Sequence, residues 1–584
     1  MIRFVWICLL VLVPQSLATA GDVARAKARG EVVEGRRGMV VCVSAPASDV
    51  GLGVLKRGGN AVDAAVATAF TLAVTWPEAG NIGGGGFMLV MPPGKPPECI
   101  EYRETAPAAA TERMYQPDET NFSHRAVGTP GTVRGLALAH QRHGKLAWKE
   151  LVMPAVRLAE EGFAVDAATA ESLNDVLQDN EPTPPDELRR VYAKLDKNGK
   201  IEPWRTGDHL KQPELAATLR LIADKGPDTF YRGKIAEQIA AEMKRGGGVI
   251  ALEDLARYEA KVREPIHGTF RGYDVFGPPP PSSGGICLVE MLNILETFDL
   301  RSSGRQSPRT AHRMIEAMRR AYRDRAAYLG DGDFVKIPAQ LTTKEYAQKL
   351  AAGIDADRAT PSASLAAEIE LAPESDHTTH FSIVDSEGMA VSNTFTLEQS
   401  YGSRVVVRGA GFLLNNEMGD FNWRPGYTDR QGNIGTKANL IAPGKRMLSS
   451  QTPTIVARDG KPVLITGSPG GRTIINTALC VVVNVCEFDM DLPAAIDAPR
   501  MHHGWFPDRV QIEAADEESA DEFSGDATEA ADGASQRKLL DALRAMGYKA
   551  STSERQGDAH SILIRDGVFR GYADPRIAGR AAGY

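Results

Sequence analysis

The spacing of apolar positions predicts that the chain begins with a sheet and its covering helices. Apolar, β-branched residues at 39–43 predict a buried strand, and small apolar residues at helical spacing predict helices over 45–58 and 60–74. A glycine cluster then leads into two further predicted strands, at 87–91 and 99–103. The first hundred residues are therefore expected to mix strands with helices.

The middle and the end of the chain have different patterns. Residues 112–358 are mostly helical in pattern, with Pro-rich breaks such as 277–285. Residues 351–376 are rich in Ala, Glu, Ser and Pro and have no clear period, which is typical of an exposed, cleavable linker. From Thr378 onward strand patterns return, and they predict strands at 379–384, 389–397, 404–407, 411–414, 454–457 and 463–466.

Two segments are predicted to lie outside the folded core. Arg3, an apolar run over 4–13 and a small-residue ending at Ala20 predict a removable export signal over 1–20. A permanent membrane anchor is disfavoured because the apolar run is shorter than the roughly 20 residues that span a bilayer. Residues 513–535 are acidic and poor in apolar side chains, which predicts a solvated loop insertion.

Composition and charge narrow the function classes. The 584 residues are 43% hydrophobic and 24% charged, as in a soluble globular protein. A net charge of −8 offers no general attraction for nucleic acid or an anionic membrane, so a small-molecule or peptide substrate is favoured. Five cysteines follow the signal, without metal-ligand spacing, and are expected to be buried apolar residues. No metal site is predicted.

A hairpin after Thr378 is predicted to bring two threonines together. If residues 386–388 form a three-residue loop, Asp385 lies opposite Met389. In that register Thr378 lies opposite Thr396, on the same face of the sheet. The two hydroxyls are therefore expected to meet.

Thr378 has a route to becoming a nucleophile. A threonine hydroxyl is weak alone, but its own free α-amino group, with an unperturbed pKa of about 7.7 to 8.0, can act as its base. This requires Thr378 to become a chain terminus. Its hydroxyl would first attack the carbonyl of His377, convert the peptide to an ester and lose that ester to water.

The residues from Thr378 to Gly402 resemble the small-subunit start of the gamma-glutamyltransferase (glutathione hydrolase) family. The matching positions read TTHFS at 378–382, AVS at 390–392 and TFTLE at 394–398. The resemblance extends in order over most of the chain through six further blocks, at 57–65, 79–87, 102–107, 415–421, 443–450 and 467–471. It implies an αββα N-terminal nucleophile hydrolase, with a large subunit over 21–377, a small subunit over 378–584 and no cofactor.

The same resemblance implies the catalytic roles. Thr378 would be the nucleophile and Thr396 its hydroxyl partner. Gly470 and Gly471 would form the oxyanion hole, where backbone N–H groups approach the reacting carbonyl without a Cβ in the way.

The resemblance also implies how the glutamyl head group is held. Arg103 would bind the α-carboxylate through its guanidinium fork, with help from Ser449 and Ser450. Glu417 and Asp420 would accept hydrogen bonds from the α-ammonium, and Glu398 would contribute there. The implied substrates are glutathione and other γ-glutamyl compounds, with water or an amino acid or peptide as acceptor, and the implied location is periplasmic or secreted.

Two departures from the family pattern leave alternatives open. Glu398 stands where some members have Asn, which bears on tolerance of glutaryl substrates. In the segment 422–439, which matches the lid loop, the gating Tyr is replaced near Gln431. A related acylase acting on glutaryl or other amides, and an inactive binding homologue, therefore remain as alternatives. Retention of both threonines and both glycines favours activity.

Overall fold

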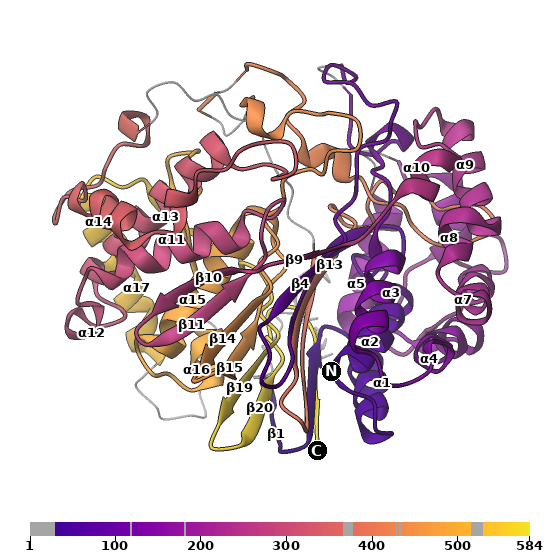
Figure 1. Ribbon diagram of the computed structural model, residues 1–584, viewed down its shortest axis with the longest axis horizontal. Helices are drawn as coiled ribbons and strands as arrows, with labels where there is room; N and C mark the ends of the chain where they lie inside the picture. Colours follow the sequence, from indigo (N-terminus) through magenta and orange to yellow (C-terminus); the bar gives the residue numbers. More distant parts are fainter. Residues whose placement is uncertain are drawn as a thin grey trace, which may run out of the picture.

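Two seven-stranded sheets stand side by side at the centre of the molecule (Figure 1). They are seen in a computed structural model that describes residues 30–116, 119–179, 183–365, 378–427, 429–430, 435–514 and 529–584. Sheet A has the order β1 (Val32–Gly35), β20 (Val568–Tyr572), β19 (Ser561–Arg565), β15 (Lys461–Thr466), β14 (Thr454–Arg458), β11 (Tyr273–Gly277) and β10 (Ile266–Phe270). All of its pairings are antiparallel.

Sheet B carries the hairpin that begins after Thr378. Its order is β21 (Arg580–Gly583), β2 (Gly38–Cys42), β12 (Thr379–Asp385), β13 (Ala390–Thr396), β3 (Gly85–Met91), β4 (Glu98–Glu101) and β9 (Lys261–Arg263). Every strand pairs antiparallel with its neighbours. The hairpin β12–β13 therefore occupies the middle of the sheet, between strands from the N-terminal part of the chain.

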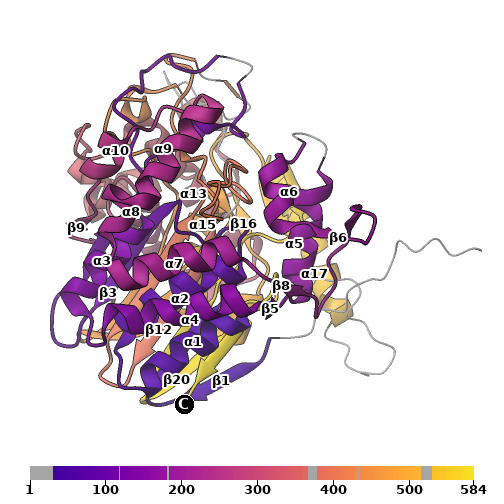
Figure 2. The ribbon, with the colours of Figure 1, turned by 90° about the vertical axis from the view of Figure 1, so that its right-hand side faces the viewer.

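Helices cover the outer face of each sheet. Those on the sheet B side are α1 (Ala45–Lys56), α2 (Ala61–Thr75), α3 (Thr132–His143), α4 (Trp148–Glu161), α5 (Ala167–Gln178), α6 (Asp186–Tyr192), α7 (Pro213–Lys225), α8 (Asp228–Arg232), α9 (Lys234–Gly246) and α10 (Leu252–Arg257). Those on the sheet A side are α11 (Gly284–Glu296), α12 (Leu300–Ser303), α13 (Pro308–Tyr328), α14 (Lys344–Ala352), α15 (Ile474–Cys486), α16 (Leu492–Asp497) and α17 (Glu529–Ala545). Figure 2 looks onto the first group, with α1, α2, α4 and α7 in front of the strands.

Because strand side chains alternate between the two faces of a sheet, the two sheets form three hydrophobic cores: one between them and one under the helices on each outer face. In β2, Val40 and Cys42 pack with the helices outside sheet B, whereas Met39 and Val41 point into the space between the sheets. Successive strand side chains face opposite sides, so a strand buried on both faces is apolar throughout. A third core joins sheet A to its own helices and contains Val456.

Short strands and 3₁₀ helices lie outside the two main sheets. Short strands form three minor sheets, which are β16 (Met501–His502) with β17 (Val510–Glu513) and β18 (Ala550–Ser553), β5 (Phe163–Ala164) with β8 (His209–Leu210), and β6 (Lys194–Leu195) with β7 (Ile201–Glu202). Short 3₁₀ helices are η1 (His124–Ala126), η2 (Ala339–Thr342), η3 (Ser362–Leu365), η4 (Glu417–Asp420), η5 (Lys437–Asn439) and η6 (Gly471–Thr473). Two of them, η4 and η6, lie at the candidate site.

Several sequence expectations need correction. The strands predicted at 404–407 and 411–414 are absent, and only an isolated bridge joins Val406 to Leu413. Positive φ angles of +60° at Arg404 and +74° at Gly411 turn the backbone out of the extended conformation there. The middle of the chain was also expected to be mainly helical, but it supplies β10 and β11 to sheet A.

Other predictions fall partly outside the described residues. The signal over 1–20 and most of the linker over 351–376 lie there, as does His377. The acidic insertion was predicted as a loop over 513–535, but Glu513 ends β17 and α17 already begins at Glu529. The five cysteines after the signal are all buried, and no disulfide joins them. Across the described residues, no helix combines the length and apolarity needed to cross a membrane.

Candidate active site

The hairpin β12–β13 has the register that the sequence predicts. Thr379 lies opposite Phe395, and the Asp385 N–H donates to the Met389 carbonyl at 3.1 Å. Gly388 closes the turn with a φ of +86°, a conformation that glycine adopts without strain. Continuing the register by one step places Thr378 opposite Thr396, and both line the same pocket.

This pocket gathers most of the residues singled out in the sequence. It is lined by Arg103, Thr378, Thr396, Glu398, Glu417, Asp420, Ser449, Ser450, Gln451, Gly471 and Ile474. Gly470 directly precedes a lining residue, and His377 lies outside the described residues. Sequence reasoning missed Gln451 and Ile474 because a glutamine in a loop and an isoleucine at a helix start carry no chemical signal by themselves.

Arg103 is the cation of the pocket, and carboxylates already surround it. The guanidinium is fully buried, with Nη1 at 2.5 Å from Glu417 Oε2 and Nη2 paired with Asp420. Its Nε donates to the Met447 carbonyl at 3.3 Å. The short helix η4 supplies both acids from a single turn, so it fixes them together on the guanidinium fork.

Burial changes the proton affinity of this cluster. It raises the pKa of Glu417 well above the usual value, and Arg103 only partly offsets the effect. Glu104, fully buried with Oε2 at 3.5 Å from Arg103 Nη1, has a pKa raised to about 8 by the same desolvation. For Arg103, burial acts to lower the pKa, but Glu417 and Asp420 more than compensate and keep it above the usual value. One guanidinium thus holds several acids that cannot all ionise readily.

Ser449 and Ser450 are held by a segment that precedes α11. The Ser449 carbonyl accepts hydrogen bonds from the Ser283 N–H at 2.8 Å and the Ser283 hydroxyl at 2.6 Å. The Ser450 hydroxyl accepts from Arg325 Nη2 at 3.1 Å, while Arg325 Nε donates to Ser283 Oγ at 2.9 Å. The Pro-rich break noted in the sequence therefore supports the serine pair that lines the pocket.

The glycine pair lies where a helix begins. Gly470 has a φ of +121° and Gly471 a φ of +51°, and α15 starts three residues later at Ile474. A Cβ on Gly470 would lie 2.6 Å from Thr473 Oγ1, so this position excludes a side chain. Unpaired N–H groups and the positive end of the helix dipole both favour negative charge at such a point.

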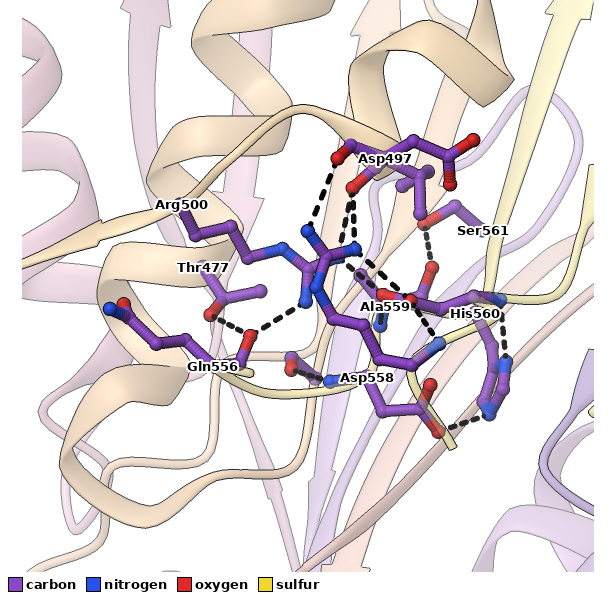
Figure 3. A network of polar contacts seen from close by, with 12 residues as sticks. Thr477, Asp497, Arg500, Gln556, Asp558, Ala559, His560 and Ser561 are labelled. Atoms are coloured by element: carbon purple, nitrogen blue, oxygen red, sulfur yellow. Dashed lines mark hydrogen bonds and ion pairs between the residues drawn. The ribbon is translucent and has the colours of Figure 1, made fainter. Parts of the chain in front are cut away.

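A buried polar network that includes Arg500, Asp558 and His560 (Figure 3) is linked to the glycine loop through Ser468. The Asp558 N–H donates to Ser468 Oγ at 2.9 Å, and the Asp558 carboxylate lies 2.7 Å from His560 Nε2. Arg500 Nη1 donates to the Gln556 carbonyl at 2.7 Å on the same segment. Because all of these contacts are buried, the segment is a rigid backing for residues 468–471.

His380 lies between the hairpin and the glycine loop. Its Nδ1 lies 2.9 Å from Thr394 Oγ1 and its Nε2 lies 3.1 Å from Ser382 Oγ. Burial lowers the His380 pKa well below its usual value, so the ring stays neutral. A Cβ on Gly467 would lie 2.4 Å from the ring, which shows how closely the two segments pack.

The segment over 422–439, which was compared with the family's lid loop on its length, is described only in part. Gln431 lies outside the described residues. The Trp423 ring stacks on Tyr115 with centroids 3.8 Å apart, and its Nε1 donates to the Met418 carbonyl at 2.7 Å. Trp423 therefore braces η4, whereas Tyr427 is 48% exposed.

Comparison with known proteins agrees with this geometry. The family model described as gamma-glutamyltranspeptidase matches residues 47–584. The chain belongs to the gamma-glutamyltranspeptidase family. The glutathione hydrolase proenzyme of Escherichia coli strain K12 is similar at 46% identity over 94% of this chain and 93% of its own length.

Solved structures place this gamma-glutamyltranspeptidase homologue among family enzymes. A cephalosporin acylase from Bacillus halodurans superposes with a TM-score of 0.81 at 28% identity, covering 97% of this chain and 99% of that one. The Helicobacter pylori gamma-glutamyltranspeptidase matches with a TM-score of 0.52 at 39% identity, over 55% of this chain and 92% of the solved chain. The fold is thus shared by a relative named as an acylase and by one named as a gamma-glutamyltranspeptidase.

Proposed function

We propose that this pocket cleaves γ-glutamyl amides such as glutathione, with Thr378 as the nucleophile. The observation that carries the proposal is the hairpin register, which sets Thr378 opposite Thr396 in a pocket that also holds Arg103. The close relatives named glutathione hydrolase support the same substrate class. Water completes hydrolysis, and an amino acid or peptide completes transfer.

The chemistry follows from a free amino group on Thr378. This amine takes the hydroxyl proton as Oγ attacks the γ-carbonyl carbon, and the resulting oxyanion accepts hydrogen bonds from N–H groups of the glycine pair. One such donor is typically worth about 3 to 4 kcal/mol. The proton then passes to the departing amine, and a γ-glutamyl ester remains on Thr378. Attack by water or an acceptor amine on that ester restores the hydroxyl.

The head group of the substrate is a zwitterion, and the pocket offers both charges. Arg103 with Ser449 and Ser450 binds the α-carboxylate in this proposal. Glu417, Asp420 and Glu398 accept from the α-ammonium. An excess of acids over the single guanidinium suits a substrate with an ammonium group better than a glutaryl group, which lacks it.

Processing at the bond between His377 and Thr378 would create the active amine, giving subunits over 21–377 and 378–584. The sheet order explains why these subunits would stay together. In sheet B the strand β12 pairs with β2 and the strand β13 with β3, and in sheet A the strand β14 pairs with β11. Each of these pairs joins one subunit to the other by backbone hydrogen bonds.

The layer arrangement and the N-terminal segment fit the same proposed enzyme. Two facing sheets with helices outside each are consistent with a four-layer αββα sandwich of the N-terminal nucleophile type. Residues 1–20 would direct export to the periplasm or medium and then be removed. The relatives named as proenzymes fit a precursor that is cleaved into two chains.

One experiment tests the nucleophile and the processing together. Purified protein is run on a denaturing gel, the smaller fragment is sequenced from its N-terminus, and γ-glutamyl-p-nitroanilide turnover is measured. We expect two fragments, a first residue of Thr378 and turnover, with one chain and no turnover for Thr378→Ala. Full turnover by an unbroken wild-type chain would exclude the mechanism.

The two alternatives give different results in the same assay. A glutaryl acylase would turn over glutaryl-p-nitroanilide faster than the γ-glutamyl compound, and an inactive homologue would turn over neither. Thr378→Ser is the matched control for the nucleophile, because it keeps a hydroxyl and an α-amine at the same position.

A further inference from the structure

Gln451 lines the pocket, and its buried side-chain amide has no hydrogen-bond partner among the residues that the structure describes. The residue is 2% exposed, and both Nε2 and Oε1 lack a hydrogen-bond partner in the described residues. It lines the pocket together with Thr378 and Ser450. Leaving a buried polar group unpaired is unfavourable, so such a side chain is expected where a ligand supplies the partner.

The backbone of Gln451 is fixed on both sides, so its side chain is presented from a rigid position. Its N–H donates to Ser449 Oγ at 3.1 Å, and its carbonyl accepts from the Ser282 hydroxyl at 2.6 Å. Gly284 packs against the same carbonyl, because a Cβ there would lie 2.6 Å away. The unpaired amide is therefore a fixed feature of the pocket wall.

The ion pairs that Arg103 already forms indicate which substrate group the Gln451 amide would bind. Nη1 of Arg103 is paired with Glu417, Nη2 with Asp420, and Nε donates to the Met447 carbonyl. An incoming carboxylate therefore meets a guanidinium whose charge is already largely compensated. Neutral donors must supply the remaining hydrogen bonds, and Gln451 directly follows the two serines proposed to do so.

We propose that Gln451 is a specificity-determining residue that donates a hydrogen bond from Nε2 to the α-carboxylate of the γ-glutamyl group. This inference rests on the proposed function of the pocket. A carboxamide suits the task because it adds a donor without adding charge beside Arg103 and its acids. The contact is present in both the bound substrate and the transition state, so its loss should raise KM more than it lowers kcat.

The test compares two anilides that differ only in the group Gln451 would contact. γ-Glutamyl-p-nitroanilide has the α-carboxylate, and 4-aminobutanoyl-p-nitroanilide lacks it. For Gln451→Leu we expect kcat/KM on the first to fall about 10-fold or more, mainly through KM, because a hydrogen bond to a charged group is lost. Turnover of the second should change less than about twofold.

A second variant and a matched control separate binding from folding. Gln451→Glu keeps the size and polarity of the side chain but sets a negative charge beside the carboxylate, so KM for the γ-glutamyl compound should rise further. Gln212→Leu alters another glutamine that is 2% exposed, but whose Nε2 donates to the Val74 carbonyl away from the pocket. It should leave the ratio between the two anilides unchanged.

Each outcome decides between the inference and the function on which it rests. Equal losses on both anilides, or no loss on either, would overturn the role of Gln451 while leaving γ-glutamyl cleavage intact. Absence of γ-glutamyl turnover in the wild-type enzyme would instead reject the proposed function, and the inference with it.

Discussion

Thr378 lies directly before strand β12 and Thr396 ends strand β13, and the register of this hairpin puts the two threonines opposite each other in one pocket. The Thr396 hydroxyl also accepts a hydrogen bond from the Glu398 N–H at 2.8 Å. Its oxygen is thereby held in place on the side of the pocket that Thr378 also lines.

Replacing Thr396 by valine should lower kcat while keeping the fold. Valine retains the shape and β-branching of threonine but has no hydroxyl to orient Thr378. We expect a fall in kcat of about 10-fold or more, equivalent to roughly 1.4 kcal/mol in the barrier. Thr396→Ser should recover most of the loss, and equal rates for the two variants would rule out the hydroxyl contact. Steady-state kinetics on γ-glutamyl-p-nitroanilide provide the measurement.

Arg103→Lys should weaken substrate binding. A lysine ammonium keeps the charge, but it cannot contact Glu417, Asp420 and a substrate carboxylate through a planar fork. We expect kcat/KM for γ-glutamyl-p-nitroanilide to fall about 10- to 100-fold, with KM rising, since hydrogen bonds to charged groups are worth about 1.5 to 3 kcal/mol.

Arg142→Lys is the control for this charge-conserving change. Arg142 also forms a two-pronged pair, with Glu98, at 3.0 Å and 2.6 Å, but at the protein surface. Its replacement should leave kcat/KM unchanged. Similar kinetics for Arg103→Lys and the wild type would contradict the assigned role.

Gly470→Ala should impair the oxyanion loop specifically. The new Cβ would lie 2.6 Å from Thr473 Oγ1, at a φ of +121° that favours glycine. The resulting shift moves the N–H donors, and loss of one such donor typically lowers kcat by about 100- to 1,000-fold. Gly388→Ala offers a matched comparison, because its φ is also positive, at +86°, yet its Cβ meets nothing within 4 Å.

Gly470→Ala and Gly388→Ala should therefore have similar effects on stability but different effects on activity. Both alanine variants introduce backbone strain of about 1 to 2 kcal/mol, so both should lower the thermal midpoint. Only Gly470→Ala should lose kcat. A comparable loss of kcat in Gly388→Ala would show that strain alone explains the effect.

The stability of the enzyme should fall with rising pH because of Glu104. Desolvation raises the pKa of Glu104 from 4.5 to about 8, so the carboxyl stays protonated in the folded protein while the unfolded chain ionises. The folded state then binds more protons, and the free energy of unfolding decreases between the two pKa values. The contribution of Glu104 to the free energy of unfolding is fully present below pH 4.5 and is lost by about pH 8.

Glu104→Gln isolates this effect. The amide keeps the shape of the protonated carboxyl but cannot ionise, so the variant should lose less stability than the wild type between pH 5 and 8. Thermal midpoints across that range measure the difference, with the exposed Glu161→Gln as the reference. Parallel pH profiles for wild type and Glu104→Gln would show that Glu104 is ionised in the folded state.

The local sequence pattern determined the hairpin, its register and the resemblance that led to the site. Alternation of apolar residues and a glycine three positions after Asp385 are sufficient for this, because strand pairing and tight turns depend on neighbouring residues. The same reasoning failed at 404–407, where positive φ angles override strand propensity. It also missed β10 and β11, of which β11 pairs with β14, a strand far along the chain.

Tertiary structure alone decided the electrostatics of the pocket. Arg103 lies hundreds of residues before η4 and the serine pair, and only folding places its guanidinium beside Glu417 and Asp420. Desolvation then sets which acids hold protons, and it leaves the amide of Gln451 buried with no hydrogen-bond partner in the described part of the chain. The sequence specified which groups are present, whereas their charge state and their unmet hydrogen bonds depend on burial, which no local pattern encodes.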